Sequence, residues 1–223
     1  MTTCLMLHGI GEPPAHAPGE EWPYWVSRFV FEAILDLVRE APARLTFDDG
    51  NASDVEIALP ALTRRGLTAA FFIPSDRIGK PHYLSEADVR ALHAAGMEIG
   101  SHGCRHLRWT DVPDAEIARD VTVSIERISS IIAAPVRSVA IPYGACDRRV
   151  LRVLRQIGIS RVYSSFRGPE LEGAWLVRRD CITRDTTLPN IKHLIAAETN
   201  AAEAAISFLR LWRRAGSAVI SKA

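Results

Sequence analysis

Short apolar segments alternate with longer segments of helical periodicity along most of the chain. The apolar segments have the length and bounding residues of buried strands, and they cover 4–8, 43–47, 68–73, 97–101, 137–142, 160–165 and 175–182. Strands that alternate with helices form a parallel sheet with crossover connections. Because seven such strands approach the eight of a closed barrel, we expect an α/β fold, a distorted (β/α) barrel of about seven parallel strands.

The helical segments carry apolar side chains at spacings of three and four, and most are bounded by capping residues or glycine. They cover 28–39, 53–65, 85–95, 117–132, 147–157 and about 190–213, the last as a C-terminal helix. In the second of these, Ser53 and Glu56 predict a capping box, and Pro60 predicts a kink.

We expect one domain over residues 1–223, because the chain shows no internal repeat or low-complexity tract. Its least regular segment is 9–25, with four prolines and three aromatic residues. This segment is too long for a tight turn, so it is expected to form an irregular loop on the barrel rim. Long loops of this kind often carry function.

Charge and composition exclude several classes of partner. Lys and Arg total 27 against 26 Asp and Glu, so no net field favours binding to nucleic acid or to an anionic membrane. No apolar run approaches the roughly 20 residues of a transmembrane helix. The four cysteines lack a CxxC pair, which favours free thiols and a reducing compartment. No export signal is evident, so a cytoplasmic protein is expected.

Candidate chemistry lies directly after two predicted strands, where the sites of barrel enzymes are found. Asp48 and Asp49 follow 43–47, and His102 and His106 follow 97–101. Two adjacent carboxylates repel, which is tolerable when one binds a cation and the other accepts a proton. Two histidines with one carboxylate leave coordination positions open, as in catalytic metal sites. Together, the two signals predict a metal site.

Three segments resemble, in order, the first three motifs of the polysaccharide deacetylases, also called NodB homology domains or carbohydrate esterase family 4. They are TFDDG (46–50), SHGCRH (101–106) and IPYG (141–144), and the recognisable core runs from about 43 to 165. The resemblance implies a distorted barrel and metal-assisted hydrolysis of an N-acetyl group, usually on an amino sugar.

Carried over by position, the resemblance also implies roles for individual residues. Asp49, His102 and His106 would hold a divalent metal, most simply Zn²⁺, although other transition metals fit the same ligands. Asp48 would be the general base. The backbone N–H of Tyr143 would stabilise the oxyanion together with the metal, and Pro142 and Tyr143 would line the substrate site.

The chain departs from the family pattern in the third and fourth motifs. The third motif usually begins with an arginine that pairs with the base, and this chain has Ala140 there. Two alternatives are open for this pairing. Either Arg178 or Arg179 reaches the base from the last predicted strand, or both arginines are solvated at the surface. Arg179 is also a candidate substrate contact. The aspartate–tryptophan element of the fourth motif has no counterpart near 162–168.

The fifth motif, an apolar strand ending in the histidine that acts as general acid, is missing after residue 165. The late His193 falls on a predicted helix. The segment LMLH (5–8) is the same kind of strand at the other end of the chain. Because the first and last strands of a closed barrel are neighbours, His8 is predicted to be the general acid that protonates the leaving nitrogen. The alternative is a histidine that only hydrogen-bonds a loop.

The sequence therefore predicts a metal-dependent N-deacetylase acting on a small carbohydrate or glycan precursor. The open alternatives are hydrolysis of another carbon–nitrogen bond, in a cyclic imide or ureide, and a degenerate sugar-binding protein. An α/β-hydrolase is excluded because the chain has no G-x-S-x-G nucleophile turn. Trp22, Tyr24 and Trp25 either stack on a sugar ring or fix the rim loop to the barrel. Cys104 is either an extra metal ligand or a buried thiol.

Overall fold

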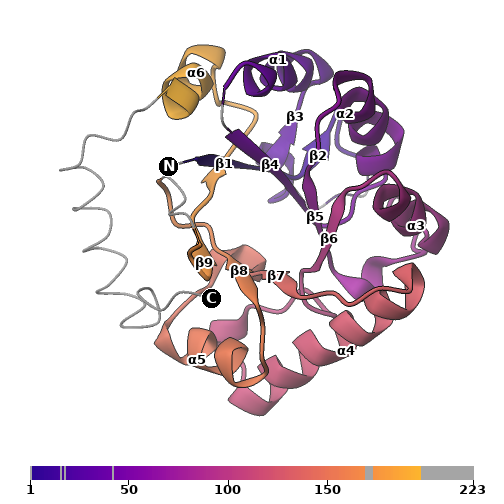
Figure 1. Ribbon diagram of the computed structural model, residues 1–223, viewed down its shortest axis with the longest axis vertical. Coiled ribbons are helices and arrows are strands. Elements are labelled where there is room, and N and C mark those ends of the chain that lie inside the picture. The colour runs from indigo at the N-terminus through magenta and orange to yellow at the C-terminus, as the bar shows by residue number, and fades with distance from the viewer. Residues whose placement is uncertain (1, 16, 18, 42, 169–172, 197–223) are drawn as a thin grey trace.

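The computed structural model describes residues 2–196 apart from 16, 18, 42 and 169–172, and it forms a curled parallel sheet ringed by helices (Figure 1). The sheet has eight strands in the order β10-β1-β4-β5-β6-β7-β8-β9, and every pair in it is parallel. Their bounds are β1 Thr3–Leu7, β4 Ala43–Asp48, β5 Ala70–Ile73, β6 Glu98–Ser101, β7 Ser138–Ala140, β8 Arg161–Tyr163, β9 Leu176–Val177 and β10 Asp180–Cys181. The predicted distorted barrel is confirmed.

The last predicted strand, 175–182, serves both edges of the sheet. Its first half, β9, pairs with β8, and its second half, β10, pairs with β1. Between them the Arg179 N–H turns away and donates a hydrogen bond to the Phe166 carbonyl (2.9 Å). The seven predicted strand segments therefore appear as eight strands, and the first and last strands are neighbours, as predicted.

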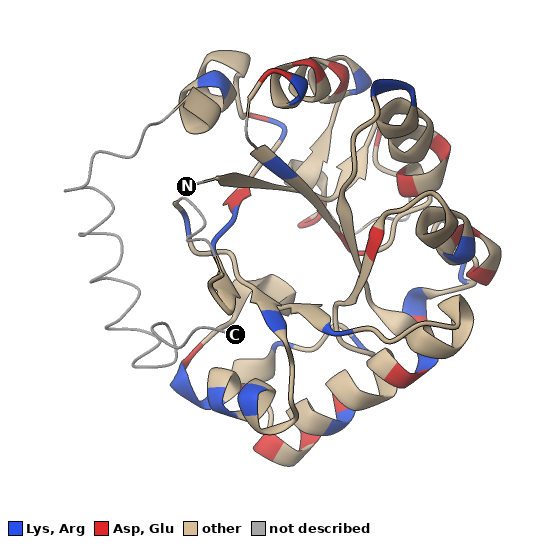
Figure 2. Ribbon diagram, in the orientation of Figure 1, with Lys and Arg blue, Asp and Glu red and all other residues tan. Residues whose placement is uncertain are grey.

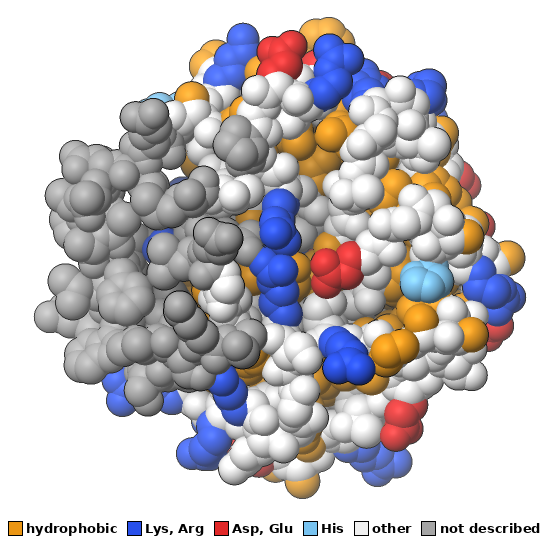
Figure 3. Space-filling model, viewed as in Figure 1, with side chains coloured by type: hydrophobic (Ala, Val, Ile, Leu, Met, Phe, Trp, Pro, Cys, Tyr) orange, Lys and Arg blue, Asp and Glu red, His pale blue; other side chains and the backbone are white. Residues whose placement is uncertain are grey.

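Helices surround the sheet because each buries one apolar face and leaves the other in solvent. They are α1 Arg28–Arg39, α2 Leu59–Arg65, α3 Glu86–Ala94, α4 Asp114–Ile132, α5 Arg148–Gln156 and α6 Leu188–Ala196. The expected helix 190–213 is described only as far as α6, and the remainder lies outside the described residues. Acidic and basic residues are interspersed along the outer helices in Figure 2. The face in Figure 3 shows charged, polar and apolar side chains mixed.

The predicted capping box at Ser53 is wrong. Its hydroxyl instead accepts the N–H of Ile10 (3.2 Å), a contact with the start of the rim loop that local sequence does not reveal. The segment begins with a π-helical turn, η2 (Asp54–Ala58), and Pro60 falls in the first turn of α2. A proline there has no intrahelical N–H bond to lose, so the predicted mid-helix kink is replaced by a change of helix type.

Two further features of the described residues bear on the sequence predictions. No disulfide joins any of the four cysteines, Cys4, Cys104, Cys146 and Cys181, all of which lie in the described part of the chain. None of the helices in this part of the chain combines the length and the hydropathy that crossing a bilayer requires.

The loop after β6 is fixed to α4 by one buried carboxylate, Asp120. One of its oxygens accepts the N–H of Arg105 (3.0 Å), and the other accepts the indole N–H of Trp109 (3.1 Å). Gly103 has a left-handed φ of 74°, and an added Cβ would lie 2.5 Å from the Asp120 carboxylate. Because this loop carries His106, Asp120 determines where that imidazole lies.

Replacing Asp120 by Asn is therefore expected to destabilise the protein by about 1–3 kcal/mol, because one of the two N–H donors loses its acceptor. Urea unfolding followed by circular dichroism measures this change. Glu116→Gln, on the same helix, is the matched control, because its ion pair with Arg105 is solvent-exposed (2.7 Å) and should change stability by less than about 0.5 kcal/mol. Equal effects of the two substitutions would contradict the anchoring role.

Candidate active site

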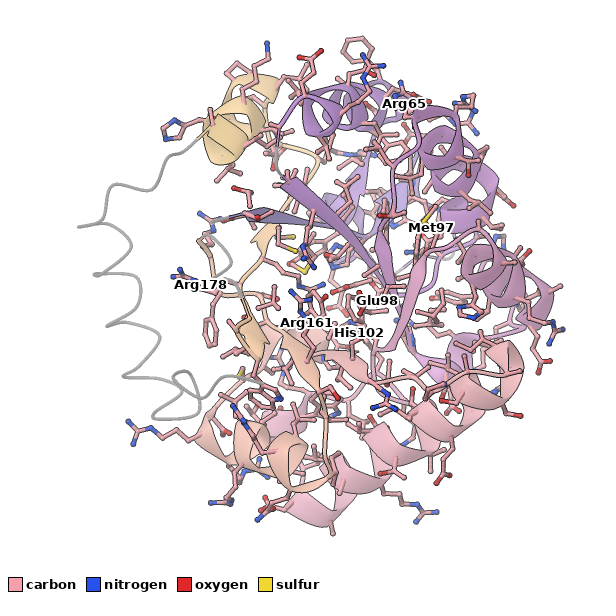
Figure 4. All side chains as sticks on the ribbon, in the orientation of Figure 1. Arg65, Met97, Glu98, His102, Arg161 and Arg178 are labelled. Atoms are coloured by element: carbon pink, nitrogen blue, oxygen red, sulfur yellow. The ribbon has the colours of Figure 1, made fainter. Side chains whose placement is uncertain are left out.

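The carboxyl ends of four strands of the sheet bring the predicted chemical groups together. His8 follows β1, Asp48 ends β4, His102 follows β6, and Tyr143 lies in a turn, η5 (Pro142–Gly144), after β7. These side chains, with Asp49 and His106, line a cavity of about 340 Å³. Figure 4 shows His102 inside the ring of strands, whereas Arg65 lies on the outer ring at α2. Parallel strands thus concentrate these groups at one end of the barrel.

Asp49, His102 and His106 form a cluster that fits a metal ion. One potential ligand atom from each lies within 4.8 Å of the others. Asp49 Oδ1 is 3.2 Å from His106 Nε2 and 3.9 Å from His102 Nε2. Although buried, this oxygen has no aligned hydrogen-bond donor among the described residues. Asp49 and His106 both have left-handed backbones (φ 80° and 54°), a strained conformation that is concentrated at functional sites.

The protonation of His102 suits a metal ligand. Its Nδ1 donates a hydrogen bond to the Ala140 carbonyl (2.9 Å), so the Nε2 lone pair faces the two aspartates. Burial lowers the pKa of His102 to about 4, and the nearby carboxylates only partly offset this effect. The imidazole is therefore neutral near pH 7. Metal-binding histidines commonly donate their second N–H to a backbone carbonyl in this way.

Burial alone would raise the pKa of Asp49. Contact with His106 and the charges of His8 and His102 outweigh burial, and they hold the pKa well below its usual range. Asp49 is therefore an ionised carboxylate, which is the state that a metal ligand requires.

Asp48 is held by Arg179 through two parallel hydrogen bonds, Nη1 to Oδ1 (2.7 Å) and Nη2 to Oδ2 (2.8 Å). Both groups are buried, with side-chain exposures of 2% and 0%. Burial by itself would raise the pKa of Asp48, but the opposing effects of Arg179 and His102 are larger together. The pKa is therefore below its usual value, and the carboxyl is ionised. Arg179 thus stands in for the arginine missing at Ala140. The Arg179 side chain is fully buried and is not among the described residues that line the cavity. Its role as a substrate contact stays a prediction.

His8 lines the same cavity, with its ring centre 4.9 Å from that of Tyr24. Its Nδ1 is buried and has no hydrogen-bond partner in the described part of the chain, so the loop-bonding alternative has no support at this atom. The charge of His8 acts on both Asp48 and Asp49. His8 therefore belongs to the cavity wall beside the two carboxylates.

The remaining substrate predictions have different outcomes. Tyr143 lines the cavity, is 56% exposed and has its ring centre 4.5 Å from that of His106. Pro142 and Trp25 are buried and are not among the described residues that line the cavity, and substrate contact by them stays a prediction. The Trp25 ring packs so closely over Gly9 that no Cβ fits there, and this contact fixes the rim loop. Trp22 is 46% exposed but donates its indole N–H to the Ala17 carbonyl (3.0 Å).

Several residues that the sequence did not single out also shape the site. Arg77, four residues after β5, places Nη1 3.2 Å from Asp49 Oδ1, and Glu21 and Arg108 lie in the cavity wall. A polar residue shortly after a strand is a sequence signal that could have found Arg77. The direction in which its side chain points, however, depends on the turn that follows the strand. The Cys104 thiol donates to Asp76 (3.1 Å) and lies outside the ligand cluster.

Comparison with solved structures shows the same fold. The chain superposes with a TM-score of 0.76 on the deacetylase PplD of Streptococcus pyogenes, with 16% identity over 87% of this chain and 97% of that one. BC0361, a polysaccharide deacetylase from Bacillus cereus, superposes with a TM-score of 0.76 and 18% identity, over 87% of this chain and 68% of that one. IcaB of Ammonifex degensii superposes with a TM-score of 0.73 and 21% identity, over 88% of this chain and 97% of that one.

Comparison of sequences gives the family. The curated protein YxkH of Bacillus subtilis (strain 168) is 24% identical over 114 residues, which are 51% of this chain and 41% of that protein. The match therefore spans less than half the length of that relative. The family model of polysaccharide deacetylases matches residues 38–162, more than half of the chain. The chain belongs to the polysaccharide deacetylase family.

Proposed function

We propose that this protein is a metal-dependent amide hydrolase that removes the acetyl group from an N-acetylated amino sugar. One observation carries the proposal. A buried carboxylate held by an arginine, Asp48, lies in the same cavity as the Asp49–His102–His106 cluster. A degenerate binding protein has no need for this buried pair, whereas a hydrolase needs an oriented base beside its metal.

The donor set supports a divalent cation, and zinc is the simplest choice for two imidazoles and one carboxylate. Asp49, His102 and His106 would hold it, since His102 is neutral and Asp49 is ionised. When bound, such an ion polarises the acyl oxygen and makes a water molecule more acidic.

Asp48 is proposed to accept the proton of the attacking water. Its two oxygens are fixed by Arg179, so the carboxylate does not have to reorient when it receives the proton. Arg179 is fixed in turn, because its Nε donates to the Ser164 carbonyl (3.0 Å). Through Arg179, the proposed base is therefore linked to the residue that follows β8 and to the strand segment that closes the barrel.

His8 is proposed to donate a proton to the departing nitrogen. Amine leaving groups are poor unless they are protonated, and imidazole groups exchange protons near neutral pH. The backbone N–H of Tyr143 is proposed to stabilise the negative charge on the acyl oxygen.

The dimensions of the cavity support a small glycan or sugar precursor. Its volume of about 340 Å³ is near the lower end of typical ligand pockets. Two tyrosines of its wall, Tyr24 and Tyr143, are 40% and 56% exposed, which leaves ring surface for stacking on a sugar.

The direct test of the function is acetate release. We expect the zinc-loaded protein to release acetate from N-acetylglucosamine and its short oligomers. Dialysis against a chelator should lower the rate by at least roughly 100-fold, and added zinc should restore it. Ring opening of cyclic imides without acetate release would instead indicate the other carbon–nitrogen hydrolase. Zinc binding without turnover of either substrate, with glycan binding unchanged in Asp48→Asn, would indicate a binding protein.

The role of His8 is tested by changing the leaving group. His8→Gln should lower kcat for amide substrates by roughly 10²–10⁴-fold, because the amine then leaves without a proton. The same variant should retain most of its activity on 4-nitrophenyl acetate, whose phenolate leaves unaided. Parallel losses on the amide and the ester would rule out general-acid catalysis by His8.

The role of Arg179 is tested by a substitution that keeps its charge. Arg179→Lys should lower kcat by roughly 10- to 100-fold with little change in KM, because an ammonium cannot make the two parallel bonds that orient Asp48. Arg184→Lys is the control, since Arg184 is 46% exposed and pairs with Glu12 (3.3 Å). An unchanged kcat in Arg179→Lys, with folding verified by thermal denaturation, would remove Arg179 from the mechanism.

A further inference from the structure

Arg77 lies between two carboxylates that belong to different parts of the site. Its Nη1 is 3.2 Å from Asp49 Oδ1, in the proposed metal cluster, and its Nη2 donates to Glu21 Oε1 (3.3 Å), in the rim loop. The three side chains are mostly buried, with exposures of 16%, 11% and 27% for Arg77, Asp49 and Glu21. Charges this close and this shielded interact more strongly than they would in water.

The position of Arg77 is set by the loops around it. It ends the short turn η3 (Ser75–Arg77), in which Ser75 and Asp76 donate their N–H groups to the carbonyls of Gly103 and Cys104 (3.1 and 3.0 Å). Its guanidinium also lies over the Tyr83 ring, 4.8 Å from the ring centre. The guanidinium is therefore held near Asp49 by contacts that do not involve the proposed metal.

We infer that Arg77 is a positioning residue that competes with the divalent metal for Asp49, and that Glu21 of the rim loop weakens this competition by sharing the guanidinium. The inference rests on the proposed function, because it requires a cation at Asp49, His102 and His106. It couples the rim loop to the metal site through one side chain.

The sign of the coupling follows from electrostatics. A guanidinium and a divalent cation that share Asp49 repel each other, so Arg77 lowers the affinity for the metal. The Glu21 carboxylate offsets part of that repulsion. Coupling of this kind is reciprocal, so metal binding should strengthen the contact between Arg77 and Glu21 by the same factor. Tyr24, three residues after Glu21, packs against His8, so the coupling extends to the wall beside the proposed acid.

The test is a zinc-affinity measurement on the full chain. Each protein is freed of metal by dialysis and titrated with zinc near neutral pH in competition with a chromophoric chelator. Arg77→Gln should bind zinc at least roughly tenfold more tightly than the unchanged chain, and Glu21→Gln should bind it several-fold more weakly. A purely structural role for Arg77 predicts the opposite result in Arg77→Gln, since a disordered Asp49 would weaken zinc binding in that variant.

Matched controls separate this pairing from a change in net charge. Arg108→Gln also removes a cation from the cavity wall, but Arg108 stacks on Tyr143 (4.9 Å) rather than lying against Asp49. Glu20→Gln removes the carboxylate next to Glu21, also from the cavity wall. Each control should change zinc affinity by less than about threefold, because more distant exposed charges are screened.

A second measurement follows the rim loop itself. Zinc should slow amide hydrogen exchange in peptides covering residues 20–26 of the unchanged chain, and it should have no such effect in Arg77→Gln. This readout does not depend on turnover.

The outcomes distinguish the inference from the proposed function. Tighter zinc binding in Arg77→Gln and weaker binding in Glu21→Gln support the inference. Zinc binding that is unchanged or weaker in Arg77→Gln overturns the inference alone, provided that the unchanged chain binds zinc and His102→Ala does not. Absence of zinc binding by the unchanged chain overturns both. If Arg77→Gln does not fold, Glu21→Gln decides, and affinity equal to or above that of the unchanged chain rejects the inference.

Discussion

The buried ion pair of Asp48 and Arg179 links the candidate active site to the strand segment that closes the barrel. An unpaired carboxylate or guanidinium in the barrel interior costs several kcal/mol, so neither charge is tolerated there without the other. Arg179 lies where the last strand segment leaves β9 and begins β10. The sheet edges that β8 and β1 would otherwise expose are covered by that segment, and its arginine neutralises the carboxylate at the end of β4.

Three buried carboxyl groups between residues 48 and 54 have different pKa shifts because their neighbours differ. Asp48 is ionised beside a guanidinium, and Asp49 is ionised beside the histidines, so the pKa of each lies below its usual value. Asp54 has neither kind of partner. Its pKa is raised well above the usual value by burial and by the charges of Asp49 and Asp48, and its oxygens have no hydrogen-bond partner among the described residues. Acids that lie close together in the sequence thus have pKa values shifted in opposite directions without any difference in their covalent chemistry.

Charged side chains are among the groups that attach the loops around the cavity to the rest of the structure. Asp120 holds the His106 loop to α4, and Arg77 links the Asp49 loop to Glu21. The packing of Trp25 over Gly9 fixes the base of the rim loop instead by shape. Attachments of this kind allow the loops to change without repacking of the barrel core.

The order of apolar and helical segments determined the barrel, the strand boundaries within a few residues and the strand ends at which His8, Asp48 and His102 lie. Period and length specify strands and helices locally, and parallel strands must place their carboxyl ends together. Tertiary structure alone decided which arginine holds Asp48, that Ser53 binds Ile10 rather than capping its own helix, and that Trp25, Pro142 and Arg179 are buried. These outcomes depend on contacts between segments up to 131 residues apart, and no local pattern encodes the direction in which a side chain leaves a turn.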